Sequence, residues 1–175
     1  MIPANLPLIG SLALRQTRPD DTDFLLKMFM AARPWLTETS HDADFVRTLF
    51  EDQYRITRHG LETLYPEHLD FVVEKTGQSV GHLTINLGRD DWRLGIVEIH
   101  PRARRKGIGR DLVKSLQTAA GSKLISLSVM AMTFPNDGLL FWLSQGFRVV
   151  DQRPPAVGLL WYPPGRPWPQ LPAAG

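Results

Sequence analysis

A glycine-rich turn between an apolar run and an amphipathic helical pattern is the feature that most constrains this chain. The apolar run ends near Pro101, and the helical pattern after the turn continues to about Ala120. Between them, Gly107 and Gly109 let the backbone turn tightly and approach a ligand without an intervening side chain. The free N–H groups of the helix point back at this turn, where the helix dipole favours negative charge. The order of strand, glycine turn and helix therefore predicts a cradle for phosphate groups.

Cationic side chains surround the two glycines and strengthen the same preference. Arg104, Arg105 and Lys106 precede the first glycine, and Arg110 follows just inside the helix. The stretch contains neither a Gly-x-x-x-x-Gly-Lys-Ser/Thr loop nor a Gly-x-Gly-x-x-Gly dinucleotide fingerprint. A Gly-x-Gly beside basic residues also fits an ordinary strand-to-helix turn with a solvated basic rim. The local sequence alone leaves both interpretations open.

The pattern Arg104-x-x-Gly107-x-Gly109 resembles the pyrophosphate-binding signature Gln/Arg-x-x-Gly-x-Gly/Ala of the Gcn5-related N-acetyltransferases (GNAT). The lead-in Ile99-x-Pro101 is also frequent in that family. The resemblance covers about residues 70 to 150 well and the first 60 loosely, and it implies that acetyl-CoA is the cosubstrate. The cofactor-binding residues that it implies in this part of the chain are Ile99, Arg104, Arg105, Lys106, Gly107, Ile108, Gly109 and Arg110.

A second stretch resembles another GNAT signature, in which an Asn opens a helix that ends in an aromatic residue, three further residues and Gly-Phe. Here Asn136 would contact the cofactor, or would serve only as the helix cap, and Gly146 suits the left-handed residue after the helix. Asn136 lies one residue closer to Gly146 than in the usual family pattern. Trp142 stands where many members carry a tyrosine whose hydroxyl protonates the departing thiolate, and an indole N–H lacks the acidity for that role.

Hydrophobic periodicity predicts the remaining elements. Strands are predicted at 12–15, 70–74, 80–87, 93–100, 124–129 and 157–162, and helices at 19–32, from 40–42 to 56, at 108–120 and after 136. The second helix would bury Phe45, Val46, Leu49 and Phe50. The strand at 124–129 would pair with that at 93–100 through a parallel crossover. With the resemblance, the pattern predicts one α/β (α+β) domain over 1–175 with the GNAT fold, a mixed, mostly antiparallel sheet of about six or seven strands flanked by about four helices.

The resemblance implies direct acyl transfer from acetyl-CoA to a primary amine of a small molecule or peptide. The amine must be neutral to attack, so a base or a water chain has to remove its proton. Glu98 and His100 share one face of the predicted strand and are the titratable groups nearest to the turn, although each also fits a structural or solvent-facing role. The backbone N–H of Ile99 is the implied donor to the thioester oxygen.

The early helical region usually borders the acceptor groove in this family. It contains Tyr54, His59 and Tyr65, each of which fits either substrate contact or packing of a helix on the sheet. The alternative to an enzyme is a non-catalytic acyl-CoA-binding sensor or scaffold, which Trp142 and the shifted Asn136 favour. Nucleic-acid binding by the basic stretch 102–110 is disfavoured, because the phosphates of one cofactor would occupy it.

Composition narrows the remaining possibilities. The net charge is only +2 and cysteine is absent, which excludes disulfides and a thiol acyl-enzyme. No metal site is indicated. No apolar run approaches the length of a membrane span and no secretory signal is recognisable, so a cytoplasmic location without membrane contact is expected. Seven of the 14 prolines fall at or after Pro154. The tail 163–175 should therefore be extended, lying on its own domain or on a second subunit of a homodimer.

Overall fold

The computed structural model describes residues 6, 8–39 and 42–168, so the end of the predicted extended tail lies outside the described residues. The chain forms two compact units. The N-terminal unit comprises Ser11–Ile85 and Ile96–Gly109, and the C-terminal unit comprises Asn86–Gly95, Arg110–Gly175 and the first ten residues. That residues 1–175 act as a single domain stays a prediction.

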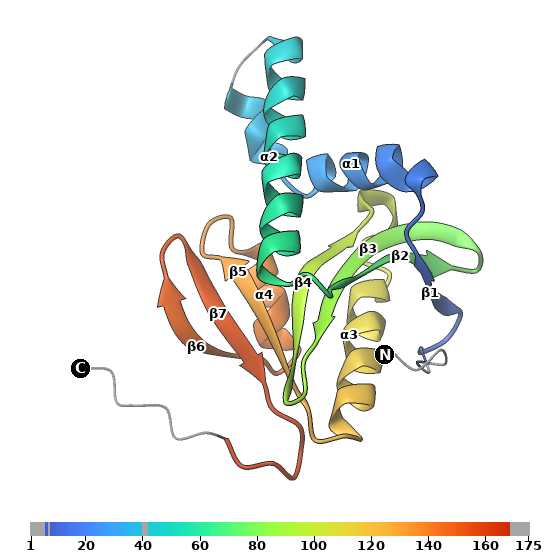
Figure 1. The fold of residues 1–175 in the computed structure, drawn as a ribbon, viewed down its shortest axis with the longest axis vertical. Helices are drawn as coiled ribbons and strands as arrows, with labels where there is room; N and C mark the ends of the chain where they lie inside the picture. Colours follow the sequence, from blue (N-terminus) through green and yellow to red (C-terminus); the bar gives the residue numbers. More distant parts are fainter. Residues whose placement is uncertain (1–5, 7, 40–41, 169–175) are drawn as a thin grey trace. The chain divides into compact units, whose positions relative to one another are not determined.

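One sheet contains all seven strands of the described residues, in the order β1-β2-β3-β4-β5-β7-β6 (Figure 1). The pairs β1–β2, β2–β3, β5–β7 and β6–β7 are antiparallel, and β4–β5 is parallel. Four α-helices accompany the sheet in this part of the chain. The prediction of a mixed, mostly antiparallel sheet with about four helices is confirmed.

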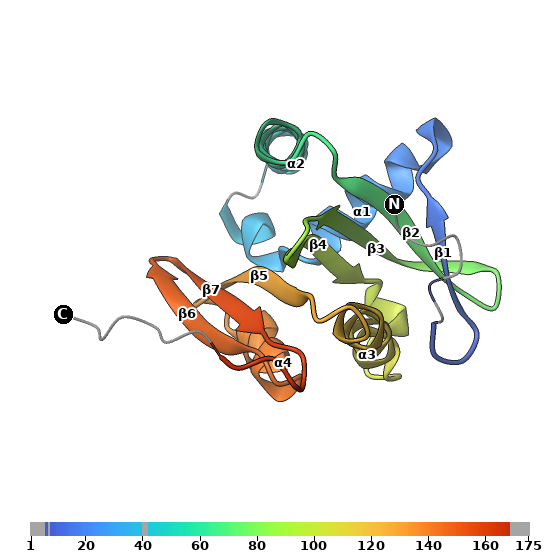
Figure 2. The ribbon, with the colours of Figure 1, turned by 60° about the horizontal axis from the view of Figure 1, so that its bottom comes forward.

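The N-terminal unit is built on an antiparallel meander. Its strands are β1 (Leu12–Gln16), β2 (Leu69–Lys75) and β3 (Gln78–Leu87), which lie side by side in Figures 1 and 2. The turn between β2 and β3 contains Thr76 and Gly77 with φ values of 51° and 75°, the left-handed conformation that a two-residue hairpin requires. The helical segments between β1 and β2 are η1 (Pro19–Asp21), α1 (Thr22–Ala31), η2 (Pro34–Thr39) and α2 (Ala43–Leu64).

Helix α2 is longer than predicted. Asp42 caps it, since its side chain accepts hydrogen bonds from the N–H groups of Asp44 and Phe45, and the helix continues beyond the predicted end at Ile56. Phe50 is fully buried as predicted, but Phe45 is 54% exposed, so the prediction of a buried Phe45 is wrong. Five residues along an α-helix rotate a side chain by about 140° around the axis. Phe50 therefore faces the interior while Phe45 faces solvent.

Strand β4 (Asp91–Ile99) begins earlier and ends one residue sooner than predicted, so His100 is not part of the strand. It leads into a 3₁₀ turn, η3 (Pro101–Ala103), and then into α3 (Ile108–Gly121). The predicted parallel crossover is confirmed, because Asp91–Leu94 of β4 pairs with Ser126–Val129 of β5 (Ser126–Met132).

The C-terminal unit buries the apolar stripe of α3, with Leu112, Val113 and Leu116 fully enclosed. Its remaining elements are α4 (Asp137–Ser144), β6 (Arg148–Arg153) and β7 (Ala156–Trp161), and α4 contacts β5 (Figure 2). Gly146 follows α4 with φ of 85°, as the predicted left-handed end of the helix requires.

The described part of the tail lies on its own unit, one of the two placements expected. Trp168 stacks on Tyr162 with ring centroids 5.2 Å apart, and the guanidinium of Arg148 lies 4.4 Å from the centre of the Trp168 ring. These contacts cover aromatic surface that would otherwise face water. Among the described residues, no helix combines the length and the apolar character that crossing a membrane requires.

Candidate functional site

The glycine turn forms an exposed bend of main chain at the start of α3. The N–H of Arg104 donates to Pro101 O at 3.2 Å, which closes η3. Arg105 and Gly107 then adopt φ values of 61° and 77°. Ile108 is 3% exposed, so it can reach a ligand only through its main chain. Because the first N–H groups of a helix have no partner within it, this bend offers unpaired donors at the positive end of α3.

The cationic residues of the turn divide into two groups. The side chain of Arg104 folds back, donating from Nε to Ile99 O at 2.8 Å and from Nη2 to Ala31 O at 3.4 Å. It thereby ties the turn to the end of β4 and to the end of α1. Arg105 and Lys106 are exposed and add positive charge beside the unpaired N–H groups. Arg104 therefore holds the bend in place, while the charges of its two neighbours give the bend a positive potential.

The main chain at the end of β4 has an orientation that suits the predicted oxyanion donor. The Ile96 N–H donates to Thr84 Oγ1 at 2.6 Å, and the His100 N–H donates to Val80 O at 2.8 Å, both on β3. Successive peptide groups in an extended chain point to opposite sides. The N–H of Ile99, between them in this alternation, therefore points away from β3.

Glu98 is a buried carboxylate with one unpaired oxygen. The residue is 8% exposed, and its Oε1 accepts a hydrogen bond from Arg33 Nη1 at 2.8 Å. Oε2 is buried and has no hydrogen-bond partner among the described residues. Burial of an unpaired carboxylate oxygen is unfavourable, and such atoms in proteins commonly have a functional reason. Of the two predicted bases, the geometry favours Glu98.

Tyr54 of α2 contacts the same aromatic residue as Arg33, the partner of this carboxylate. Its ring meets Phe29 of α1 edge-on, with centroids 5.3 Å apart. Burial raises the pKa of the Tyr54 phenol, and the negative charges of Asp70 and Glu98 add to the effect while Arg58 opposes it. The hydroxyl is therefore a hydrogen-bond donor throughout the neutral range.

His100 and His59 have surroundings that differ from those of Glu98. His100 caps η3, and its Nδ1 accepts the N–H of Arg102 at 3.2 Å. In the neutral ring the proton then resides on Nε2, so neither nitrogen offers a free lone pair for a base. His59 is exposed on α2, and Tyr65 ends that helix. Tyr54, another of the three predicted acceptor-side residues, has Glu98 among the charges around it.

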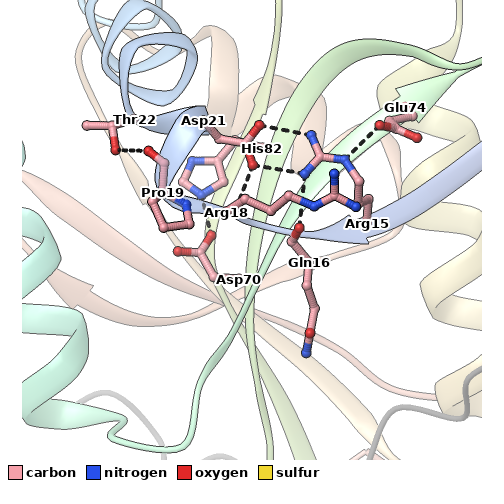
Figure 3. Close-up of polar contacts among 9 residues, drawn as sticks. All are labelled: Arg15, Gln16, Arg18, Pro19, Asp21, Thr22, Asp70, Glu74 and His82. Carbon is pink, nitrogen blue, oxygen red and sulfur yellow. Dashed lines mark hydrogen bonds and ion pairs between the residues drawn. The ribbon is translucent and has the colours of Figure 1, made fainter.

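A second buried polar group connects β2, β3 and α2. His82 is 1% exposed, and its Nε2 lies 2.6 Å from Asp70 Oδ1, as Figure 3 shows. Arg58 Nη1 donates to the other oxygen of Asp70. Burial alone would raise the pKa of Asp70, but the hydrogen bonds and charges of His82 and Arg58 outweigh it and hold that pKa below its usual range.

Arg15 organises a third polar group, which lies at the edge of the same unit (Figure 3). Its Nη1 and Nη2 donate to the two oxygens of Asp21 at 2.9 Å, and its Nε donates to Glu74 at 2.9 Å. The hydrogen bonds from Arg15 lower the pKa of Asp21 to about 2. This group joins β1, η1 and β2 and has no unpaired buried atom, so it has a structural character.

The C-terminal unit contains the other predicted residues. Asn136 occupies the cap position of α4, but its side chain makes no capping hydrogen bond, so capping does not explain it. Arg110 is exposed and lies 3.6 Å from the Asp111 carboxylate. Trp142 is 6% exposed, with its ring edge-on to Phe147 at 4.9 Å. The indole is therefore a core side chain.

Sequence reasoning missed Arg33, Arg58, Asp70 and His82. One signal was available, since His82 and Thr84 alternate with Leu83 and Ile85 in the middle of a predicted strand. Both polar side chains are buried, and a polar residue in such a strand indicates a buried partner elsewhere in the chain. Among the described residues, no group of three or more His, Cys, Asp and Glu side chains is arranged to hold a metal ion.

Comparison with known proteins identifies the class of protein to which this fold belongs. The model of the acetyltransferase (GNAT) family matches residues 25–147. The chain therefore belongs to the GNAT family, and acetyl-CoA is its cosubstrate. No curated protein matches the chain by sequence.

Solved structures share the fold at low sequence identity. The PaiA N-acetyltransferase from Thermoplasma acidophilum, in complex with coenzyme A, has a TM-score of 0.64 and 13% identity, covering 87% of this chain and 99% of that chain. An acetyltransferase from Thermus thermophilus has a TM-score of 0.62 and 19% identity, covering 89% and 99%. The ribosomal-protein-S18-alanine N-acetyltransferase from Escherichia coli has a TM-score of 0.54 and 11% identity, covering 86% and 93%.

Proposed function

We propose that this chain transfers an acetyl group from acetyl-CoA directly to a primary amine. The observation that carries the proposal is Glu98, a buried carboxylate whose Oε2 has no partner among the described residues. In the N-terminal unit, Glu98 precedes by a few residues the bend whose unpaired N–H groups suit a diphosphate. Acyl transfer from a nucleotide carrier to an amine requires a proton acceptor and a binding site for the phosphates. This short segment offers one at each end.

In this proposal the bend binds the diphosphate of the cosubstrate. The main-chain N–H groups of Ile108 and Gly109 donate to phosphate oxygens, and Gly107 allows the close approach. Arg104 fixes the bend, while Arg105 and Lys106 add charge. In the C-terminal unit, Arg110 and Asn136 stay predicted cofactor contacts.

Glu98 acts as the general base. Its Oε2 takes a proton from the acceptor ammonium, and the neutral nitrogen attacks the thioester carbonyl carbon. As the C–N bond forms, negative charge develops on the carbonyl oxygen, to which the Ile99 N–H donates. The C–S bond then breaks, and coenzyme A departs as a thiolate.

The departing thiolate needs no acid from the position of Trp142. A thiol has a pKa of about 8.5, so its anion is a tolerable leaving group near neutral pH. The attacking nitrogen carries a positive charge in the tetrahedral adduct and loses its second proton as the amide forms, so the thiolate takes its proton from this nitrogen or from water. We therefore expect the buried indole to slow the reaction relative to a tyrosine rather than to abolish it.

The alternative is a non-catalytic acyl-CoA-binding sensor or scaffold, and Trp142 is the observation that favours it. The partner that we expect is a small-molecule or peptide amine acceptor, without nucleic acid or membrane. A cytoplasmic location and a homodimer also stay predictions.

Isothermal titration with acetyl-CoA, followed by thiol release with a panel of amines, tests these functions. The enzyme should bind acetyl-CoA and release thiol with one class of amine, and Glu98→Gln should keep the binding and lose most of the release. Binding without release from any amine would support the sensor. Absence of binding, together with salt-sensitive affinity for RNA or DNA, would overturn both.

A further inference from the structure

Arg33 has a set of contacts that an ordinary surface ion pair lacks. It follows the end of α1, and its Nη1 donates both to Phe29 O at 3.0 Å and to Glu98 Oε1 at 2.8 Å. Its guanidinium carbon lies 3.6 Å from the centre of the Phe29 ring. The guanidinium is thus held by a carbonyl, by an aromatic face and by a carboxylate that is 65 positions away in the sequence.

We propose that Arg33 is a positioning residue, which holds Glu98 by Oε1 so that Oε2 is left to bind the acceptor amine and take its proton. This inference rests on the proposed function. Arg33 itself touches neither the amine nor the cosubstrate in this proposal, and acts through Glu98.

The two carboxylate oxygens of Glu98 have different surroundings, and this difference supports the positioning role of Arg33. A carboxylate that served only to join α1 to β4 would place its second oxygen on another donor or in water, since burying it unpaired is costly. Here Oε2 is buried without a partner among the described residues. A ligand N–H would satisfy it. The cation on Oε1 meanwhile compensates the buried negative charge without occupying the oxygen that the reaction needs.

The other charged and titratable groups around Glu98 are either paired with one another or uncharged near neutral pH. Asp70 of β2 is bonded to His82 of β3 and to Arg58 of α2, so these three groups are paired with one another. Tyr54 of α2 carries no charge in the neutral range, because burial raises the pKa of its phenol. Arg33 is therefore the cation that pairs with Glu98.

Phe29 of α1 contacts both Arg33 and α2, with the Arg33 guanidinium on its ring face and the Tyr54 ring edge-on to it. These contacts restrict the Arg33 side chain, which lies just beyond the end of the helix. Such restriction is what holds a catalytic partner to within the fraction of an ångström that proton transfer demands.

The test compares four variants with the wild type: Arg33→Gln, Arg33→Lys, Glu98→Gln and the double variant Arg33→Gln/Glu98→Gln. For each, kcat/KM for the best amine, KM for acetyl-CoA and the thermal midpoint are measured. Arg33→Gln should lower kcat/KM for the amine about 10- to 100-fold, since misplacement of a catalytic group has effects of this size. KM for acetyl-CoA should change by less than about 2-fold, and Arg33→Lys should recover part of the loss because it restores the charge.

The decisive comparison is whether the effect of Arg33→Gln on kcat/KM depends on the presence of Glu98. In the Glu98→Gln background, Arg33→Gln should cause no further loss of kcat/KM, because the group through which it acts is already absent. Arg15→Gln is the matched control. Arg15 is a similarly enclosed arginine in the same unit, with 23% of its side chain exposed against 26% for Arg33, and its removal should lower the thermal midpoint but not kcat/KM.

Three results would overturn the inference. Unchanged kcat/KM in Arg33→Gln, while Glu98→Gln loses activity, would show that Glu98 needs no positioning. A loss that is as large in the Glu98→Gln background, or that follows the thermal midpoint and is not recovered by lysine, would assign Arg33 a structural role. A wild-type protein that releases no thiol with any amine would instead refute the proposed function, and the inference with it.

Discussion

Two regions of the N-terminal unit differ in the chemical groups that they present. One is the glycine turn over 104–109, and the other is the buried group formed by Glu98, Arg33, Phe29 and Tyr54. The turn is exposed and offers main-chain N–H groups, shaped by two residues with positive φ. The Glu98 group is enclosed and offers one side-chain oxygen, held by contacts up to 65 positions apart. The first site depends on backbone conformation, and the second depends on which side chains tertiary packing brings together.

This difference sets what each region tolerates. A main-chain site accepts changes in its side chains provided that the backbone keeps its shape and nothing fills the space for the ligand. A buried ion pair tolerates little, because removing one partner leaves the other charge unpaired. The four predictions below follow from this contrast.

The largest effect is expected from filling the turn. Gly109→Glu would place a negative side chain where the diphosphate is proposed to lie, and should weaken acetyl-CoA binding by about 100-fold or more, about 2.7 kcal/mol. Titration calorimetry measures the affinity. The fold should be retained, because the turn is at the surface. Gly60→Glu, which adds the same charge on α2 where a Cβ would meet no atom within 4 Å, is the control, and equal affinities in the two variants would refute the assignment of the turn.

The second prediction concerns the close approach of β3 to β4 at Glu98. A Cβ at Gly81 of β3 would lie 2.6 Å from the carbonyl oxygen of Glu98 and 2.9 Å from Ile99 Cδ1. Gly81→Ala must therefore push β3 and β4 apart, and should cost about 2 kcal/mol of unfolding free energy, the usual size of overpacking. Urea unfolding measures it.

Gly60→Ala provides the comparison for this substitution. It fills open space in a helix and should stabilise the protein by about 0.5–1 kcal/mol. If Gly81→Ala were as well tolerated, β3 and β4 would not approach each other as closely as described. In that case the position of Glu98 would not depend on the absence of a side chain at residue 81.

The third prediction concerns the charges of Asp70, His82 and Arg58. Asp70→Asn removes the carboxylate that both partners bind and should lower the unfolding free energy at pH 7 by about 1 kcal/mol or more. Because the pKa of Asp70 is lowered in the folded protein, the stability that its charge contributes is present above its unfolded pKa of about 3.9. This contribution is lost as the pH falls through the folded pKa.

The difference between wild type and Asp70→Asn should therefore be full at pH 7 and should shrink below about pH 4. Urea unfolding at pH 7, 5 and 3 measures it. Asp52→Asn, which affects an exposed pair on α2, serves as the control and should change the free energy by less than about 0.5 kcal/mol. A difference for Asp70→Asn that grew on acidification would reverse the assigned direction of the pKa.

The same contrast explains how much of the molecule the sequence predicts. Gly107 and Gly146 act within a few residues of the chain, so their turns and the helices beside them follow from local pattern. The parallel pairing of β4 with β5 follows from the order of strand, helix and strand together with the handedness of such crossovers. The family resemblance depends on these local features.

Contacts between distant segments do not follow from such patterns. Nothing in the sequence near Arg33 indicates that its partner is Glu98, because the contact depends on how α1 crosses the sheet. Phe45 fits the apolar stripe of α2 but is exposed. The sequence pattern predicts which side chains share a face of the helix, but it does not predict how much of that face the rest of the protein covers. His100 continues the apparent alternation of β4 but caps the next turn. Element ends are where capping and strand pairing compete for the same residue.

The smallest effect is expected from removing one cation of the turn. Lys106 is exposed, so its interaction with a phosphate is screened by water and salt. Lys106→Ala should weaken acetyl-CoA binding only about 3-fold, and the loss should diminish as the salt concentration rises from about 0.05 to 0.5 M. Lys27→Ala, an exposed lysine of α1, should leave affinity unchanged. A loss for Lys106→Ala as large as that for Gly109→Glu would mean that side-chain charge, rather than the main chain, binds the cosubstrate, and the contrast between the two regions would fail.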